Sequence, residues 1–160
     1  MSQSELTAIV EPYPFAEEFI LDWKVMHSRS EIAGPFQSIE WMELAVKYYG
    51  DGSVPLPLRF VDSRNKTKAF GFFRETRSSG KIGSKRVLRT IDNNSQRIMP
   101  VLAENWHDVV LALIGLYKKY SHQYDTIDFF KLSIDEEAGR EIGKVLGDSG
   151  IGMDLQEFNC

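Results

Sequence analysis

The stretch from Leu56 to Glu75 constrains the fold of this chain more than any other. Two apolar runs, Leu56–Val61 and Ala69–Phe73, flank a polar segment at Ser63–Lys68. Apolar runs on either side of a short polar segment are typical of two antiparallel strands joined by a turn, and Asn65 suits such a turn. We therefore expect a β-hairpin here and take it as the reference for the rest of the chain.

One short strand and two helices are expected before the hairpin. Alternating residues at Glu5–Val10 predict the strand, which Pro12 would end because proline donates no ladder hydrogen bond. Apolar residues at helical spacing predict a helix over Phe15–His27. A second helix follows, with Ser38 as its N-cap and Gly50 at its end.

The apolar pattern after the hairpin predicts three strands and two helices. In order, these are a strand at Arg86–Asp92, a helix at Leu102–His122, a strand at Thr126–Leu132, a helix opened by the capping box Ser133–Glu136 and closed by Gly147, and a strand at Gly150–Phe158. Gly71, inside the second hairpin strand, indicates a β-bulge or else a close approach of the backbone to a ligand.

This order of elements predicts the fold class. Helices on both faces of a mixed sheet are the economical packing of such a series. We therefore expect an α+β fold, in which a mixed and mainly antiparallel sheet is flanked by helices on both faces. At 160 residues the chain is expected to form a single domain over residues 1–160.

Composition narrows the class of protein further. The only cysteine is Cys160, so a disulfide within the chain and a cysteine-based zinc cluster are both excluded. The first residues lack the basic start and long apolar core of a signal peptide, and no window approaches the length of a membrane span. A cytoplasmic protein without a metal is the expectation.

Charge is distributed unevenly along the chain. Residues 1–50 carry a net charge of −5, residues 51–100 carry +7 and residues 101–160 carry −6. The basic middle either pairs with the acidic flanks in the fold or faces an anionic ligand. Nucleic acid is not expected as a partner, because the total charge is −4. The cations proposed to bind an anion are Arg74, Arg77, Lys81, Lys85, Arg86 and Arg89.

The segment Thr76–Lys85 contains two glycines and several cations, which superficially suggests a phosphate-binding loop. A P-loop needs four residues between its glycines and then Gly-Lys-Ser or Gly-Lys-Thr. Gly80 and Gly83 are only three positions apart and do not meet that pattern. We therefore expect a solvated loop at this place.

The element order and four stretches of sequence resemble the GNAT acyltransferase fold. More narrowly, the chain resembles the acetyltransferase-like family associated with cellulose and capsule biosynthesis, which is akin to the Fem-type aminoacyltransferases. The four stretches are Phe15–Met26 with Trp23 at the place of a family tryptophan, Pro35–Trp41, which is similar to F-x-S-x-x-W, the strand end Lys68–Phe72, and Tyr124–Gly150.

The resemblance implies an N-acyltransferase that transfers an acetyl or aminoacyl group to an amine or a sugar. That family has two GNAT-like halves, and this sequence matches the first one, which helps to shape the acceptor groove. An acyl-CoA donor would be bound mainly by the second half, because the pyrophosphate-binding turn R/Q-x-x-G-x-G/A is not found here. The expected partners are such a second half, or another copy of the chain, and an anionic small-molecule or glycan acceptor.

The residues do not identify a catalytic base. Glu40, Glu75 and His107 are the carboxylates and histidine that we consider for that role, although His107 equally fits a surface or capping residue. The alternative function is a non-catalytic binding or assembly module that has the same fold.

Overall fold

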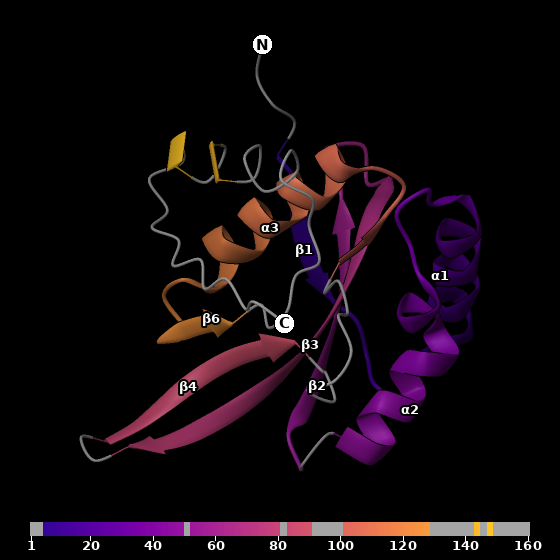
Figure 1. Cartoon of the computed structure of the whole chain (residues 1–160). Coiled ribbons are helices and arrows are strands. Elements are labelled where there is room, and N and C mark those ends of the chain that lie inside the picture. The colour runs from indigo at the N-terminus through magenta and orange to yellow at the C-terminus, as the bar shows by residue number, and fades with distance from the viewer. Residues whose placement is uncertain are drawn as a thin grey trace, which may run out of the picture.

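The computed structural model describes residues 5–49, 52–80, 83–90, 101–128, 143–144 and 147–148. These residues form an α+β fold in which helices cover both faces of one sheet (Figure 1), as the sequence predicts. The elements are β1 (Thr7–Val10), α1 (Glu17–Arg29), the 3-10 helix η1 (Pro35–Gln37), α2 (Ile39–Tyr49), β2 (Val54–Val61), β3 (Thr67–Gly80), β4 (Gly83–Thr90), β5 (Val101–Ala103), α3 (Trp106–Tyr120) and β6 (Thr126–Asp128).

The sheet has the strand order β1-β2-β3-β4-β6, and β5 pairs with β3 beside β4. The strands β1 to β4 are joined antiparallel, whereas β6 returns parallel to β4 after the crossover through α3. The long strand β3 pairs with β5 through Ala69–Gly71 and with β4 through Phe73–Gly80. The expected hairpin is therefore confirmed, and its second strand lies in the middle of the sheet.

Alternation along β3 divides the apolar core into two parts. Phe70 and Phe72 pack among the buried residues of α1 and α2, including Phe19 and Trp23. Ala69 and Phe73 point to the other face and pack with the buried residues of α3. Because successive strand residues point to opposite faces, a run that is apolar throughout can serve both layers at once.

Several predicted turns and caps are confirmed. Asn65 in the β2–β3 turn has a φ of 60°, in the left-handed region that asparagine tolerates. The Ser38 hydroxyl accepts a hydrogen bond from the Trp41 amide at 3.2 Å, as an N-cap does. In α3 the cap is instead Asn105, whose side chain accepts a hydrogen bond from the Asp108 amide at 3.0 Å.

The predicted loop at Thr76–Lys85 is wrong. Its described residues belong to β3 and β4, which continue as a two-stranded ribbon up to the pair Gly80 and Gly83. The ribbon extends beyond the helices at the lower left of Figure 1. Its outer part contacts solvent on both faces, so it needs no alternation of apolar residues, and the sequence pattern could not reveal it.

One helix boundary and the position of one bulge also differ from the predictions. The helix predicted from Leu102 begins only at Trp106, because Leu102 lies in β5, where it pairs opposite Phe70. The bulge predicted at Gly71 is wrong, because the register is regular there and shifts instead between Phe60 and Val61.

The lack of space beside Gly71 explains why the strand has a glycine at this position. A Cβ at this position would lie 2.7 Å from the Phe73 ring and 3.0 Å from the Phe60 ring. The close approach that a strand glycine indicates is therefore made by two aromatic rings of the core.

Most of the predicted elements near the C-terminus lie outside the described residues. These are the rest of the strand at Thr126–Leu132, the capping box Ser133–Glu136 and the strand at Gly150–Phe158; Gly50 and Lys81 also lie outside. Residues 143–144 and 147–148 are helical. Within the described ranges, no helix combines the length and the apolar character that crossing a membrane requires.

The contact between α3 and β1 depends on Gly115. A Cβ at this position would lie 2.3 Å from the carbonyl oxygen of Leu6. This is a backbone atom, so no side chain can rotate away to make room.

We expect Gly115→Ala to lower the free energy of unfolding by about 1–3 kcal/mol, even though alanine is the better helix former. Urea denaturation measures the change. Gly147→Ala is the matched control, because a Cβ there meets nothing within 4 Å, so it should cause no loss. Equal stability of the two variants would contradict the close packing of α3 on β1.

Candidate functional site

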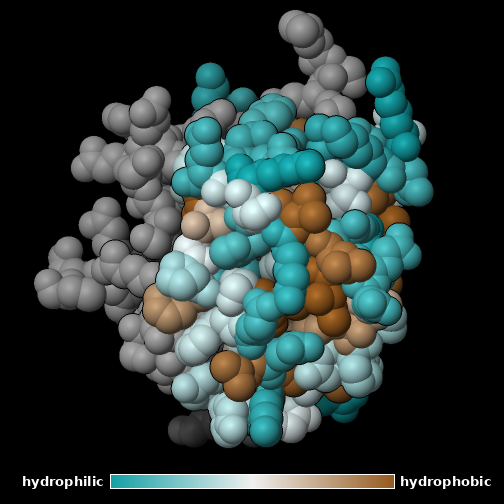
Figure 2. Space-filling model, turned by 90° about the vertical axis from the view of Figure 1, so that its right-hand side faces the viewer, coloured by the Kyte–Doolittle hydropathy of each residue, from teal (hydrophilic) through white to brown (hydrophobic). Residues whose placement is uncertain are grey.

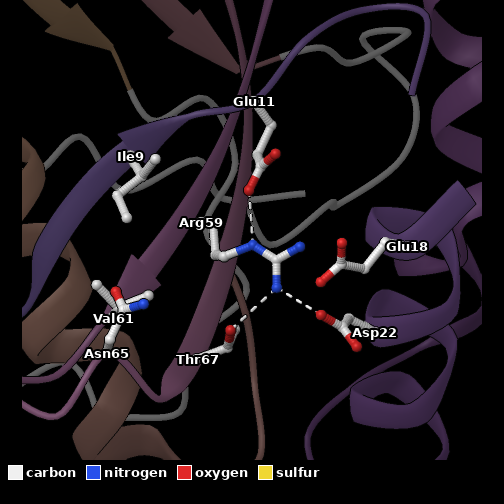
Figure 3. A pocket seen from close by; sticks show the side chains of 8 residues that line it. All are labelled: Ile9, Glu11, Glu18, Asp22, Arg59, Val61, Asn65 and Thr67. Carbon is white, nitrogen blue, oxygen red and sulfur yellow. Dashed lines mark hydrogen bonds and ion pairs between the residues drawn. The ribbon is translucent and has the colours of Figure 1, made fainter. Parts of the chain in front are cut away.

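A pocket of about 380 Å³ lies where β1 ends, α1 begins and the β2–β3 hairpin turns (Figure 3). It is lined by Ile9, Glu11, Glu18, Asp22, Arg59, Val61, Asn65 and Thr67. In Figure 3 the two carboxylates of α1 point toward Arg59 from one side, and Ile9 and Val61 lie on the other side. The accessible lining of the pocket is mainly polar.

Arg59 is the central residue of this pocket. The register pairs it with Ile9 of β1 and with Phe70 of β3, which places its side chain on the face covered by α1. Its Nε donates to Glu11 Oε1 at 2.6 Å, and its Nη1 donates to Asp22 Oδ2 at 2.5 Å and to Thr67 Oγ1 at 3.1 Å. One guanidinium therefore joins the end of β1, helix α1, and strands β2 and β3.

The surroundings of Arg59 keep it charged. Its side chain is only 14% exposed, and its guanidinium lies over the rings of Phe19 and Phe70, at 5.7 and 5.3 Å from their centroids. Burial acts to lower the pKa of the guanidinium, but the hydrogen bonds to Asp22 and Glu11 outweigh burial and raise that pKa above its ordinary value. The arginine is a permanent cation that cross-links the fold.

The carboxylates of the pocket differ in their exposure and in whether they are paired with Arg59. Glu11 is 18% exposed and Asp22 is 45% exposed, and both are paired with Arg59. Glu18 is exposed on α1 and, among the described residues, it forms no ion pair with Arg59. In Figure 3 its carboxylate points into the pocket beside the second terminal nitrogen of Arg59.

The sequence reasoning did not identify this pocket. Its signal is a single arginine within the apolar run Leu56–Val61, since a charge among core residues requires partners of opposite sign. Glu11, directly after β1, and Asp22, between the buried positions of α1, are those partners. Nothing in the linear sequence relates the three positions before the register of β1 and β2 is known.

The cations proposed from the sequence lie on the β3–β4 ribbon, and the sheet separates them. Arg74 is opposite Arg89, and Arg77 is opposite Arg86. Since directly opposite residues share a face and successive residues alternate, the first pair lies on the α1–α2 face, together with Lys85, and the second pair lies on the α3 face. Lys81 lies outside the described residues.

Arg74 is largely buried. It is 8% exposed, and its Nη1 donates to the carbonyl oxygen of Tyr49 at the end of α2, at 3.0 Å. This contact fixes the end of α2 on the sheet. Of the proposed anion-binding cations on the α3 face, Arg77 is exposed and Arg86 is 45% exposed.

Arg86 belongs to a cluster with Glu75 and Tyr124. Its Nη2 lies 3.1 Å from Glu75 Oε1, and its guanidinium lies 5.0 Å from the centre of the Tyr124 ring. The Tyr124 hydroxyl donates to Glu75 Oε2 at 2.9 Å. Burial first, and then the hydrogen bond to Glu75, raise the pKa of Tyr124 to about 12. Both carboxylate oxygens of Glu75 thus already accept hydrogen bonds.

The three residues considered as a base are not brought together. Glu40 lies on α2, on the opposite side of the sheet from Glu75, and it forms an exposed ion pair with Lys24 at 2.7 Å. The hydrogen bond from Lys24 is the main cause that lowers the pKa of Glu40. His107 is exposed in the first turn of α3. No three His, Cys, Asp or Glu side chains are grouped to hold a metal ion in the part of the chain that the structure describes.

Comparison with known proteins gives no family for this chain. No protein-family model matches it. No curated protein sequence matches it either.

Solved structures of similar shape exist. The chain is similar to a single-substitution mutant of the BH1408 protein from Bacillus halodurans, with 15% identity over 96% of this chain and 97% of that chain and a TM-score of 0.48. It is also similar to a protein from Pyrococcus furiosus named "putative acetyl transferase". The identity is 12% over 98% of this chain and 99% of that chain, and the TM-score is 0.48. A third similar structure is an integron cassette protein from V. cholerae, with 10% identity over 99% of this chain and 94% of that chain and a TM-score of 0.43.

Replacing Arg59 with methionine should lower the free energy of unfolding by about 2–4 kcal/mol, because Glu11 and Asp22 would lose their shared cation. Urea denaturation is the measurement. The matched control is Lys24→Met, which breaks an ion pair whose side chains are 53% and 61% exposed and should cost less than about 1 kcal/mol. A cost for Arg59→Met no larger than that of the control would show that Arg59 is not a cross-link.

The raised pKa of Tyr124 predicts a loss of stability at high pH. Unfolded tyrosine ionises at about pH 10, whereas Tyr124 in the folded chain ionises at about pH 12. The stabilisation that protonated Tyr124 gives the folded state is therefore complete below about pH 10 and is lost as the pH rises to about 12. Urea denaturation across this range should show the loss. Burial raises the pKa of Tyr120 as well, so ionisation of Tyr120 adds to the loss of stability at high pH.

Tyr124→Phe should reduce this loss without removing it. Tyr48→Phe is the control, because Tyr48 is 64% exposed. If both variants kept the full pH dependence of the parent chain, the role of the hydrogen bond between Tyr124 and Glu75 would be disproved.

Proposed function

We propose that this chain is the acceptor-side unit of a GNAT-like N-acyltransferase, which transfers an acetyl or aminoacyl group to an amine or a sugar. The observation that supports the proposal is the order of the described elements. A strand and two helices precede an antiparallel β2–β3–β4 meander, and α3 then leads to β6, which lies parallel to β4. The short strand β5 before α3 is a departure from the order on which the resemblance to the GNAT fold rests.

An acyl-CoA donor does not fit the helix N-termini of the described part. Free amides at a helix N-terminus are the usual site for a diphosphate. In α3 the Asn105 side chain already accepts the hydrogen bond of the Asp108 amide, and the acidic residues Glu104 and Asp108 lie beside it. The first turns of α1 and α2 are acidic as well. This supports a donor bound outside the described residues, as in a second GNAT-like half.

The surface of α1 and α2 supports a partner protein. Figure 2 shows apolar side chains gathered among polar ones on the side of the molecule that these helices cover. The exposed apolar residues of the two helices include Leu21, Val25, Leu44 and Tyr48. Exposed apolar groups of this kind are typical of surfaces that pack against another protein.

The α3 face of the ribbon supports an anionic acceptor. Arg77 and Arg86 stand directly opposite each other there, and like charges in this arrangement repel. Glu75 is paired with Arg86 and compensates only one of the two charges. An acceptor with phosphate or carboxylate groups, such as a nucleotide-linked sugar, would compensate the other.

The second candidate function is a non-catalytic binding or assembly module. The poor fit of a diphosphate to the N-termini of α1, α2 and α3 favours it, because a module of this kind needs no acyl donor.

Calorimetric titrations test the proposal. Acetyl-CoA should not bind this chain up to about 1 mM, whereas UDP-glucose, as a probe for a nucleotide-linked sugar, should bind saturably. Arg77→Gln should weaken the UDP-glucose affinity about fivefold, the loss of one exposed charge-assisted contact. Arg64→Gln, at the exposed tip of the β2–β3 hairpin, is the matched control and should leave the affinity unchanged.

Two results would contradict the proposal in different ways. Saturable binding of acetyl-CoA would show that the donor site lies in this chain and that it is not only an acceptor-side unit. Failure of UDP-glucose to bind, or equal losses in Arg77→Gln and Arg64→Gln, would remove the acceptor site on the ribbon and favour the non-catalytic module.

A further inference from the structure

We propose that two copies of this chain associate through helix α1, which packs antiparallel against α1 of the second copy about a twofold axis. The inference rests on the proposed function only in expecting a partner protein on the surface of α1 and α2. Self-association is measured without an acyl donor or an acceptor, so each proposal can fail without the other.

Four exposed residues of α1 form one continuous ridge along the helix. Glu17, Leu21, Val25 and Arg29 follow one another at intervals of four residues, and residues at this spacing are neighbours on a helix surface. Leu21 is 57% exposed and Val25 is 46% exposed, and the two charged residues at the ends are exposed as well. The opposite side of α1 is buried against α2 and the sheet, so the ridge faces away from the core.

The order of these residues makes the ridge complementary to a second copy of itself. It runs from an acid through two apolar residues to a base. If two such helices cross antiparallel about a twofold axis, Leu21 meets Val25 of the second copy and Glu17 meets Arg29 of the second copy. A twofold interface requires this kind of self-complementarity. Ridges at four-residue spacing also pack against one another in the commonest class of helix contact.

The dipole of α1 alone does not explain the ridge. An acid in the first turn and a base in the last turn are each favourable in a single helix, which accounts for Glu17 and Arg29 one at a time. It does not account for the two large apolar side chains that lie in water between them. Among the described residues, neither Glu17 nor Arg29 forms an ion pair, so both charges can pair across an interface.

The size of the contact predicts a weak dimer. Helix α1 has 13 residues and is therefore about 20 Å long. One pair of such helices buries less than the ~1,600 Å² of a standard interface. Sedimentation velocity from about 5 to about 500 µM measures the association, because the dimer fraction depends on the protein concentration. The mean mass should rise across this range toward that of two chains.

Charge reversal tests the register of the two helices. Arg29→Glu should weaken dimerisation about tenfold, because the twofold axis makes two attractive pairs repulsive at once. Adding Glu17→Arg should restore the affinity to within about threefold of the parent chain, because the pairs then form with their charges exchanged. Lys118→Glu is the matched control, since it reverses an exposed cation of α3, on the other face of the sheet, and should leave dimerisation unchanged.

Recovery in the double variant separates pairing from damage to the helix. Both substitutions oppose the dipole of α1, so a loss of helix stability would be larger in the double variant than in either single one. Leu21→Gln keeps both charges and the buried side of α1, and it should weaken dimerisation as well. A monomer at every concentration, equal losses in Arg29→Glu and Lys118→Glu, no recovery in the double variant, or unchanged dimerisation of Leu21→Gln would each overturn the proposal.

Discussion

The structure depends on β3, the strand in the middle of the sheet, which pairs with neighbouring strands along both of its edges. Its first part pairs with β5 and its later part with β4, while its other edge pairs with β2 along most of its length. Because side chains alternate across a strand, this one segment supplies Phe70 and Phe72 to the layer under α1 and α2 and Phe73 to the layer under α3. Gly71 lies between them, where aromatic rings leave no room for a Cβ. Any change in the register of β3 would therefore disturb both layers.

The same alternation creates the pocket. Leu58 and Phe60 of β2 point into the core under α3, so Arg59 between them must point to the α1 side. A charge in that position is costly unless it is compensated, and Glu11 and Asp22 compensate it from two other elements. Fixing these elements around one guanidinium also leaves a hollow beside it. The pocket is thus a direct consequence of how β1, α1 and the hairpin are joined.

Local sequence patterns were sufficient for the hairpin, the two first helices, the α+β class and the turn at Asn65, because each depends on neighbouring residues. They failed where the partner is remote in sequence. Leu102 continues the apolar pattern of α3, yet it lies in β5 because β3 offers it a free edge. The outer part of the ribbon has no apolar alternation, since both of its faces contact solvent, and it was taken for a loop. The Arg59 pocket was missed for the same reason, as its charges come from β1, α1 and β2.

The uneven charge along the chain had two explanations, internal pairing or an anionic ligand, and the structure shows internal pairing for several of the cations. Arg59 is accounted for by pairing with the acidic N-terminal part, and Arg86 by Glu75 within the basic segment itself. Arg77, opposite Arg86, is not compensated by Glu75 in the same way and lies on an exposed ribbon. Internal pairing therefore explains Arg59, and on the ribbon it also explains Arg86.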